Sequence, residues 1–178
     1  SKTAAKIASR KSLAAEGFSI ETMIADGKAP AVFVIGNDER GVLFGVGKLL
    51  RSLETSRDRV ALPAALDVTT APAMPIRGHQ LGFRPKTNSY DGWDLPQWEQ
   101  YIRDLAVFGC NTIELIPPRS DDAADSPHFR RPQLEMMFGM SHLAADYGLD
   151  VSIWYPAMDT SYATEAEIKA GLEEWHGV

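Results

Sequence analysis

Five side chains suited to ligand binding fall on or just after three apolar segments of the sequence: Arg77, His79, Arg84, Glu114 and Trp154. A guanidinium offers a fixed fork of donors and keeps its charge. A carboxylate within a strand must be paired or hydrated, because burying it alone is costly. The flat apolar face of a tryptophan can stack on a pyranose ring. These five residues are therefore the candidate substrate-binding residues.

Each candidate also has a structural explanation that the sequence leaves open. Arg77 and Glu114 are expected either to form a buried ion pair with each other or to contact hydroxyl groups of a ligand. His79 fits a hydrogen-bonded core histidine better than a ligand-binding one. Arg84 suits a surface charge, and Trp154 is equally well explained by packing in the core.

The candidates are carried by a predicted strand–loop–helix–strand unit. Residues 76–83 and 111–116 are predicted strands, which should pair in parallel through a right-handed crossover. Asp94 is a good N-cap, and Gln97 can complete a capping box with it. Gly109 is placed to end the helix in a left-handed conformation. Three-and-four spacing predicts a buried helix face made of Trp98, Tyr101, Ile102, Leu105 and Phe108.

The flanking segments extend this pattern. After the unit, the sequence predicts a helix from Pro132 to Gly148 with a buried side that includes Leu134, Met137, Met140 (or Phe138), Leu143, Ala144 and Tyr147. A strand over 151–155 and a helix over 165–175 come next. Before the unit, it predicts a helix over 2–15, a hairpin of strands 18–25 and 31–35, a helix from Val42, and short strands over 60–62 and 66–69. The apolar run 31–35 is expected to be a central strand.

A phosphate-binding loop is not supported between the hairpin and its helix. Gly36 and Gly41 have the spacing of a P-loop, but Val42 and Leu43 stand where Lys and Ser or Thr would contact the phosphates and magnesium. We predict a strand-to-helix turn instead, with glycines that let the helix approach the sheet closely.

Several segments resemble glycoside hydrolases of the family 20 and family 67 type, the β-hexosaminidases and α-glucuronidases. The resemblance rests on PIRG at the start of a strand, SYDGWD before a helix and FGCNTIEL after it, preceded by FVIGNDERGVLFGVGKLLRSLE. It implies an α/β chain: a small α+β domain over residues 1–72, then the first βα units of a TIM-type (β/α)8 barrel over residues 75–178. The segment IELIPP departs from the hexosaminidase pattern, which has an acidic pair there.

The resemblance also implies roles for residues. The arginine of its RG motif, here Arg77, would hold hydroxyl groups of the sugar. Cleavage of a glycosidic bond needs two carboxyl groups, or one and an attacking substrate group. In the resembling enzymes the main carboxylates come from the fourth strand onward. Glu114 and Asp159 are the only carboxylates near predicted strand ends, and they do not make a pair. The catalytic residues therefore stay unknown.

A complete barrel of this type takes about 250 residues, and residues 75–178 hold three of its eight units. The expectation is thus a fragment, itself inactive, of a glycoside hydrolase, with self-association through the open barrel edge. The alternatives are a non-catalytic carbohydrate-binding or interaction module and a small open α/β sheet. An acidic residue at the end of a fourth strand, beyond Val178 in a longer gene, would favour the hydrolase.

The composition of the chain argues against several classes of binding partner. The chain has 178 residues, 44% of them hydrophobic, and a net charge of −6, which argues against non-specific binding to nucleic acid or an anionic membrane. No apolar stretch approaches the roughly 20 residues of a membrane span. The four histidines lack the spacing of metal ligands, so neither a metal nor a cofactor is predicted. The single cysteine, Cys110, is expected to be structural, and a secreted or periplasmic parent protein is left open.

Overall fold

The N-terminal half is built on a three-stranded antiparallel sheet. The computed structural model describes residues 13–23, 29–62, 66–81, 93–115, 131–153 and 164–176. Strands β1 (Phe18–Met23), β2 (Ala31–Gly36) and β5 (Asp67–Thr70) form the sheet in the order β2-β1-β5. Helix α2 (Glu39–Arg51) packs on it through Phe44, which joins Phe18 and Ile20 in a small apolar cluster. The predicted helix over 2–15 falls largely outside the described residues.

One expectation for this sheet is wrong, and one strand beside it was missed. The apolar run 31–35 was expected to be central, but β2 has one neighbour and β1 has two, so β1 is the central strand. The apolar run reflects packing of α2 against one face of β2. It does not determine the order of the strands in the sheet. A further hairpin, β3 (Glu54–Ser56) with β4 (Arg59–Ala61), precedes β5. Strand β4 matches the strand predicted over 60–62, whereas β3 is exposed and polar, so no hydrophobic pattern marked it.

Helix α2 begins three residues earlier than predicted because Asp38 caps it. The Asp38 carboxylate accepts a hydrogen bond from the backbone N–H of Gly41 at 2.8 Å. The close approach predicted for the glycines is confirmed. A Cβ at Gly45 would lie 2.5 Å from Cγ1 of Val34 in β2, and one at Gly47 would overlap the carbonyl oxygen of Val107. The second contact brings α2 against α3 (Leu95–Val107).

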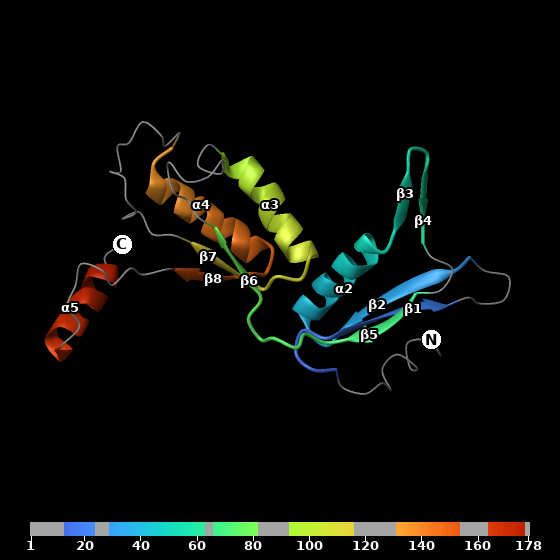
Figure 1. Ribbon diagram of the computed structural model, residues 1–178, viewed down its shortest axis with the longest axis horizontal. Coiled ribbons are helices and arrows are strands. Elements are labelled where there is room, and N and C mark those ends of the chain that lie inside the picture. The colour runs from blue at the N-terminus through green and yellow to red at the C-terminus, as the bar shows by residue number, and fades with distance from the viewer. Residues whose placement is uncertain are drawn as a thin grey trace.

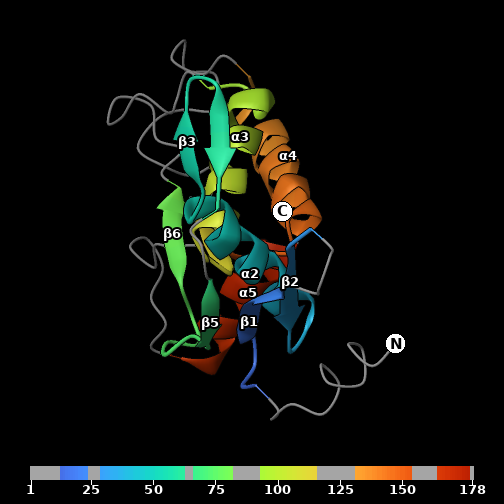
Figure 2. The ribbon, with the colours of Figure 1, turned by 90° about the vertical axis from the view of Figure 1, so that its right-hand side faces the viewer.

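The C-terminal half is built on a parallel sheet. Strands β6 (Gly78–Leu81), β7 (Thr112–Leu115) and β8 (Asp150–Ile153) lie in sequential order. Helices α3 and α4 (Gln133–Asp146) connect them and cover the same face of the sheet, and α5 (Glu165–His176) comes after β8 (Figure 1). The predicted parallel pairing is confirmed. In Figure 2, α2 lies between the antiparallel sheet and α3.

The capping signals predicted for the two ends of α3 are confirmed. Asp94 accepts a hydrogen bond from the Gln97 backbone N–H at 3.2 Å, and the Gln97 side chain accepts one from the Asp94 N–H at 3.0 Å. Gly109 has a φ of +93°, the left-handed conformation predicted for it. Phe108, however, was expected in the core and is 69% exposed. It is the C-cap residue, and its ring lies under the guanidinium of Arg51.

The main apolar core lies between α3, α4 and the parallel sheet. Its largest fully buried side chains are Trp98, Ile102, Ile113, Leu115, Met136 and Met140. Met140 and Ala144 were predicted correctly on α4, whereas Leu134 and Phe138 are exposed and Met136 was missed. The helix is apolar on more than one side, so spacing alone did not choose the buried face. None of the helices in the described ranges is both long and apolar enough to cross a bilayer.

The contact of α2 with α3 can be tested with Gly47→Ala. Alanine favours a helix by about 1 kcal/mol over glycine, but its methyl group would meet backbone that cannot rotate away. We expect a net loss of about 1–3 kcal/mol in the free energy of unfolding, the usual range for overpacking, measured by urea denaturation. Gly139→Ala is the matched control, because its Cβ would meet only the rotatable side chain of Leu95. Equal stability of the two variants would contradict the close contact.

Candidate functional site

The carboxyl ends of the parallel strands are where ligands bind in α/β proteins. Strands β6, β7 and β8 end at Leu81, Leu115 and Ile153. Residues 82–92, 116–130 and 154–163, which come after them, lie outside the described residues. Arg84 and Trp154 are among these, so their assignment to substrate binding stays a prediction.

The register of the three strands separates their side chains into two faces. His79 lies beside Ile113 and Val151, and Leu81 lies beside Leu115 and Ile153. Ile113 and Leu115 are buried under α3 and α4, so this set faces the helices. Because side chains alternate along a strand, the other set faces away from the helices: Gly78, Gln80, Thr112, Glu114, Asp150 and Ser152.

The face away from the helices is polar, and one row of it contains Glu114. Gln80, Glu114 and Ser152 are register partners across the three strands, one position before each strand ends. We call these three residues the polar row. Neighbouring strands are about 4.8 Å apart, so the three side chains can contact one ligand together. Gln80 and Ser152 are exposed and Glu114 is half-buried.

The polar row offers varied hydrogen-bonding chemistry. The Glu114 carboxylate makes no hydrogen bond or ion pair with any residue that the structure describes. A carboxylate accepts hydrogen bonds, and a hydroxyl group can both donate and accept them. A side-chain amide offers a separate donor and acceptor. Gln80 and Ser152 were not singled out from the sequence. The signal was present as polar and apolar alternation in HQL, TIEL and DVSI, which assigns each polar residue to one face once the strands are aligned.

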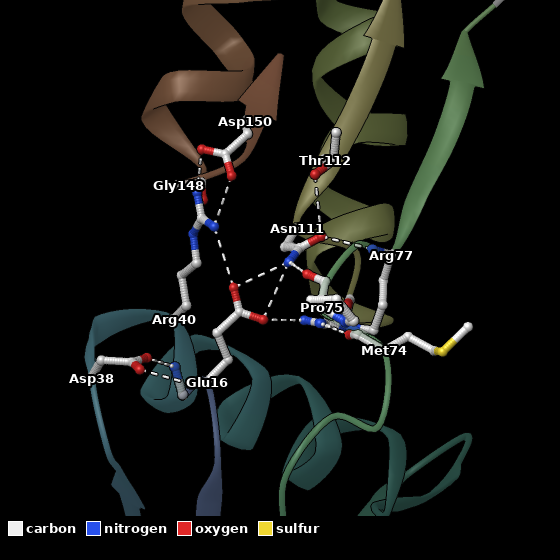
Figure 3. Close-up of polar contacts among 12 residues, drawn as sticks. Glu16, Asp38, Arg40, Met74, Pro75, Arg77, Asn111, Thr112, Gly148 and Asp150 are labelled. Carbon is white, nitrogen blue, oxygen red and sulfur yellow. Dashed lines mark hydrogen bonds and ion pairs between the residues drawn. The ribbon is translucent and has the colours of Figure 1, made fainter. Parts of the chain in front are cut away.

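Arg77 lies at the opposite, amino edge of the sheet, immediately before β6 (Figure 3). Its Nη2 donates to Glu16 at 2.6 Å, its Nε to the carbonyl of Gly109 at 2.9 Å and its Nη1 to the carbonyl of Met74 at 2.9 Å. The predicted pairing with Glu114 is therefore wrong, since Glu16 is the ionic partner and Glu114 lies beside Gln80, toward the carboxyl end of the strands. Every guanidinium nitrogen donates to the protein, which favours the structural explanation of Arg77.

His79 also faces the helices and not the polar row. Its Nδ1 lies 3.0 Å from the hydroxyl oxygen of Tyr101, and the two rings are 5.7 Å apart. Trp93 packs edge-on against both Tyr101 and Trp98, with ring centroids 5.5 and 5.1 Å apart. These contacts favour a structural role for His79, but its side chain is exposed, so the expected place in the core is wrong.

Cys110 comes directly after the C-terminal turn of α3. Partial burial raises the pKa of its thiol, and the charge of Arg77 opposes this only in part. A thiol with a raised pKa is a poor nucleophile at neutral pH. This environment favours the structural role expected for Cys110. Within the described ranges, no group of His, Cys, Asp and Glu side chains is arranged to hold a metal ion.

Comparisons with known proteins add no family. No model of a protein family matches the chain, and no curated protein is significantly similar to it. The candidate site therefore rests on the geometry of the parallel sheet.

Glu16 carries the most strongly hydrogen-bonded carboxylate of the amino edge. Desolvation by burial is the largest single influence and acts to raise its pKa. The hydrogen bonds from Arg77, Asn111 and Arg40, together with the charge of Arg77, outweigh this and hold the pKa below the ordinary value of 4.5. A carboxyl group with a lowered folded-state pKa stabilises the fold above its unfolded pKa. That contribution is lost as the pH falls through the folded-state value.

Glu16→Gln tests this electrostatic contribution. Because hydrogen bonds to a charged group contribute about 1.5–3 kcal/mol each, we expect the variant to lose about 2 kcal/mol at pH 7. The difference from the wild type should shrink as the pH falls below 4.5, measured by urea denaturation between pH 3 and 7. Glu54→Gln, which removes an exposed carboxylate of β3, is the control. A difference independent of pH would contradict the lowered pKa.

Proposed function

We propose that this chain is part of a carbohydrate-active glycoside hydrolase and contributes one section of the wall of its TIM-type barrel. In such a barrel the strands succeed one another in sequence order and the helices lie outside. The order β6-β7-β8, with α3 and α4 on one face, agrees with that arrangement. In a doubly wound sheet, by contrast, the helices cover both faces and the strand order reverses at a switch point.

The polar row is the observation that carries the proposal. In a barrel, the face away from the helices is the interior, and its carboxyl end opens to the substrate. Gln80, Glu114 and Ser152 occupy that face next to the strand ends. Sugar rings present hydroxyl groups that donate and accept, and the row supplies an amide, a carboxylate and a hydroxyl. We assign the row to holding the hydroxyl groups of a bound saccharide.

Glu114 acts in binding under this proposal and not as one of a catalytic pair. Two carboxyl groups about 5–9.5 Å apart flank the bond that a glycosidase cleaves. Among the described residues, the polar row contains one carboxylate. The other acidic residue of the same face, Asp150, lies at the amino end and pairs with Arg40. The resemblance places the catalytic carboxylates on later strands of the barrel.

A non-catalytic carbohydrate-binding module is the second candidate. The single carboxylate of the polar row favours it, because a binding face needs no catalytic pair. The two candidates share the saccharide-binding face and differ in hydrolysis. Release of reducing ends by the intact gene product, after incubation with chitin oligosaccharides or glucuronoxylan, would favour the hydrolase.

Saccharide binding is tested by titrating isotopically labelled protein with chitin oligosaccharides and with glucuronoxylan oligosaccharides. We expect amide signals of Gln80, Glu114 and Ser152 to shift with at least one of the two series. Glu114→Gln should weaken that binding about tenfold, because a hydrogen bond to a charged group is worth about 1.5–3 kcal/mol and 1.4 kcal/mol is a factor of ten.

Glu54→Gln is again the matched control and should leave the affinity unchanged, since β3 is remote from the parallel sheet (Figure 1). If neither series shifts the polar row, or if Glu114→Gln binds as tightly as the wild type, the proposed function is wrong.

A further inference from the structure

Glu16 is held in an unusual conformation at the junction of the two sheets. Its φ is +57°, the one positive value among non-glycine residues of the described chain. The left-handed region is unfavourable for any residue with a Cβ. In this conformation its carboxylate accepts hydrogen bonds from Arg77 at 2.6 Å, from Arg40 at 3.2 Å and from Asn111 at 3.1 Å (Figure 3). A costly backbone conformation that persists points to a role for the side chain.

The same set of contacts reaches the start of each parallel strand. Arg77 immediately precedes β6, and its backbone N–H donates to Oδ1 of Asn111 at 2.9 Å. Asn111 immediately precedes β7, is 3% exposed, and donates to Glu16 and to the carbonyl of Pro75 at 2.8 Å. Asp150 is the first residue of β8. Each strand is therefore held at its amino end.

Arg40 of α2 makes the connection to β8. Its Nη1 and Nη2 donate to the two carboxylate oxygens of Asp150 at 3.0 and 2.6 Å, and its Nε donates to the carbonyl of Gly148 at 2.8 Å. Its Nη1 also donates to Glu16. A fork of this kind fixes orientation as well as distance, which a single point charge does not.

Packing specifies the position of β7 far better than that of its neighbours. Ile113 and Leu115 of β7 are 0% and 1% exposed. On β8 the equivalent residues, Val151 and Ile153, are 36% and 48% exposed, so they contribute less to fixing the register. Strand β6 reads Gly-His-Gln-Leu and has one apolar side chain. A slip of one residue would turn Gln80 or Ser152 toward the helices.

We propose that Glu16 and Arg40 are positioning residues that fix the register of β6 and β8 against β7 and so align the polar row. They reach across from the N-terminal half and supply the constraint that apolar packing does not give to the two outer strands. The alignment itself is a property of the fold. Its effect on saccharide binding rests on the function proposed above.

The positioning role can be tested in the absence of a saccharide. Amide hydrogen exchange is measured in the variants Arg40→Lys and Glu16→Gln and compared with the wild type. Arg40→Lys keeps the charge but loses the fork to Asp150. Because the Asp150 side chain is 63% exposed, the lost fork is screened by solvent, and amides of β8 should exchange several-fold faster in Arg40→Lys. Both β6 and β8 should respond in Glu16→Gln. The amide signals of Gln80 and Ser152 should shift, and those of the β3–β4 hairpin should not.

The matched control is Arg103→Lys. Arg103 pairs with Glu99 at 2.8 Å and contacts the Tyr147 hydroxyl at 3.0 Å, so it joins α3 to α4 away from the strand starts. It should leave the exchange of β6 and β8 and the signals of the polar row unchanged. If Glu16→Gln does not fold, Asp150→Asn replaces it. This variant removes only the carboxylate bound by Arg40 on β8, so exchange should quicken in β8 and not in β6.

The saccharide titration separates this inference from the proposed function. If the wild type binds a saccharide, both Arg40→Lys and Glu16→Gln should weaken that binding several-fold while Arg103→Lys does not. If the wild type binds none, the proposed function fails and the exchange measurements still decide the positioning role. The inference is overturned if the variants only lower global stability, with β6, β7 and β8 exchanging together and the polar-row signals unmoved.

Discussion

The carboxylate of Glu16 is the contact on which the arrangement of the two halves depends. It is shielded from water and accepts hydrogen bonds from two arginines and an asparagine that come from three separate segments. Removing this charge takes the shared acceptor from the buried Asn111 amide and from two half-buried arginines, which destabilises the junction. The close approach of α2 to α3 at Gly47 then joins the two halves a second time, by shape and not by charge.

The two edges of the parallel sheet carry different kinds of polar contact. The amino edge is occupied by arginine–carboxylate contacts that hold the protein together. Toward the carboxyl edge, the face away from the helices carries Glu114 between an amide and a hydroxyl, and no described residue engages its carboxylate. This division is the reason that we propose the second edge for ligand binding. A polar residue in a strand therefore has to be assigned to an edge as well as to a face before it is called functional.

Local signals in the sequence predicted much of the fold. The capping box of Asp94 and Gln97 and the left-handed Gly109 are decided within a few residues, and both are confirmed. Phe108 and Leu134 were misplaced because a helical stripe does not say where the neighbouring element ends. The predicted central position of β2 was wrong for a similar reason. Pairing across β1 depends on the whole sheet and not on the apolar run itself.

The candidate site was predicted in part. Glu114 was found because a carboxylate in a strand is unusual. Its neighbours Gln80 and Ser152 become visible only when three strands are aligned in register. The partner of Arg77 could not be found, since Glu16 is 61 residues away, between the predicted helix over 2–15 and the predicted strand over 18–25. Nothing local distinguishes it from any other surface acid.

The junction at Glu16 also bears on the order of events during synthesis. Glu16 bonds to Asn111 across 95 residues, and Arg40 bonds to Asp150 across 110. N-terminal segments emerge from the ribosome first and generally fold first. Glu16 and Arg40 are therefore synthesised before every strand of the parallel sheet that they hold. The contacts that align this sheet cannot form until most of the chain has been made, since their partners Asn111 and Asp150 lie far along it.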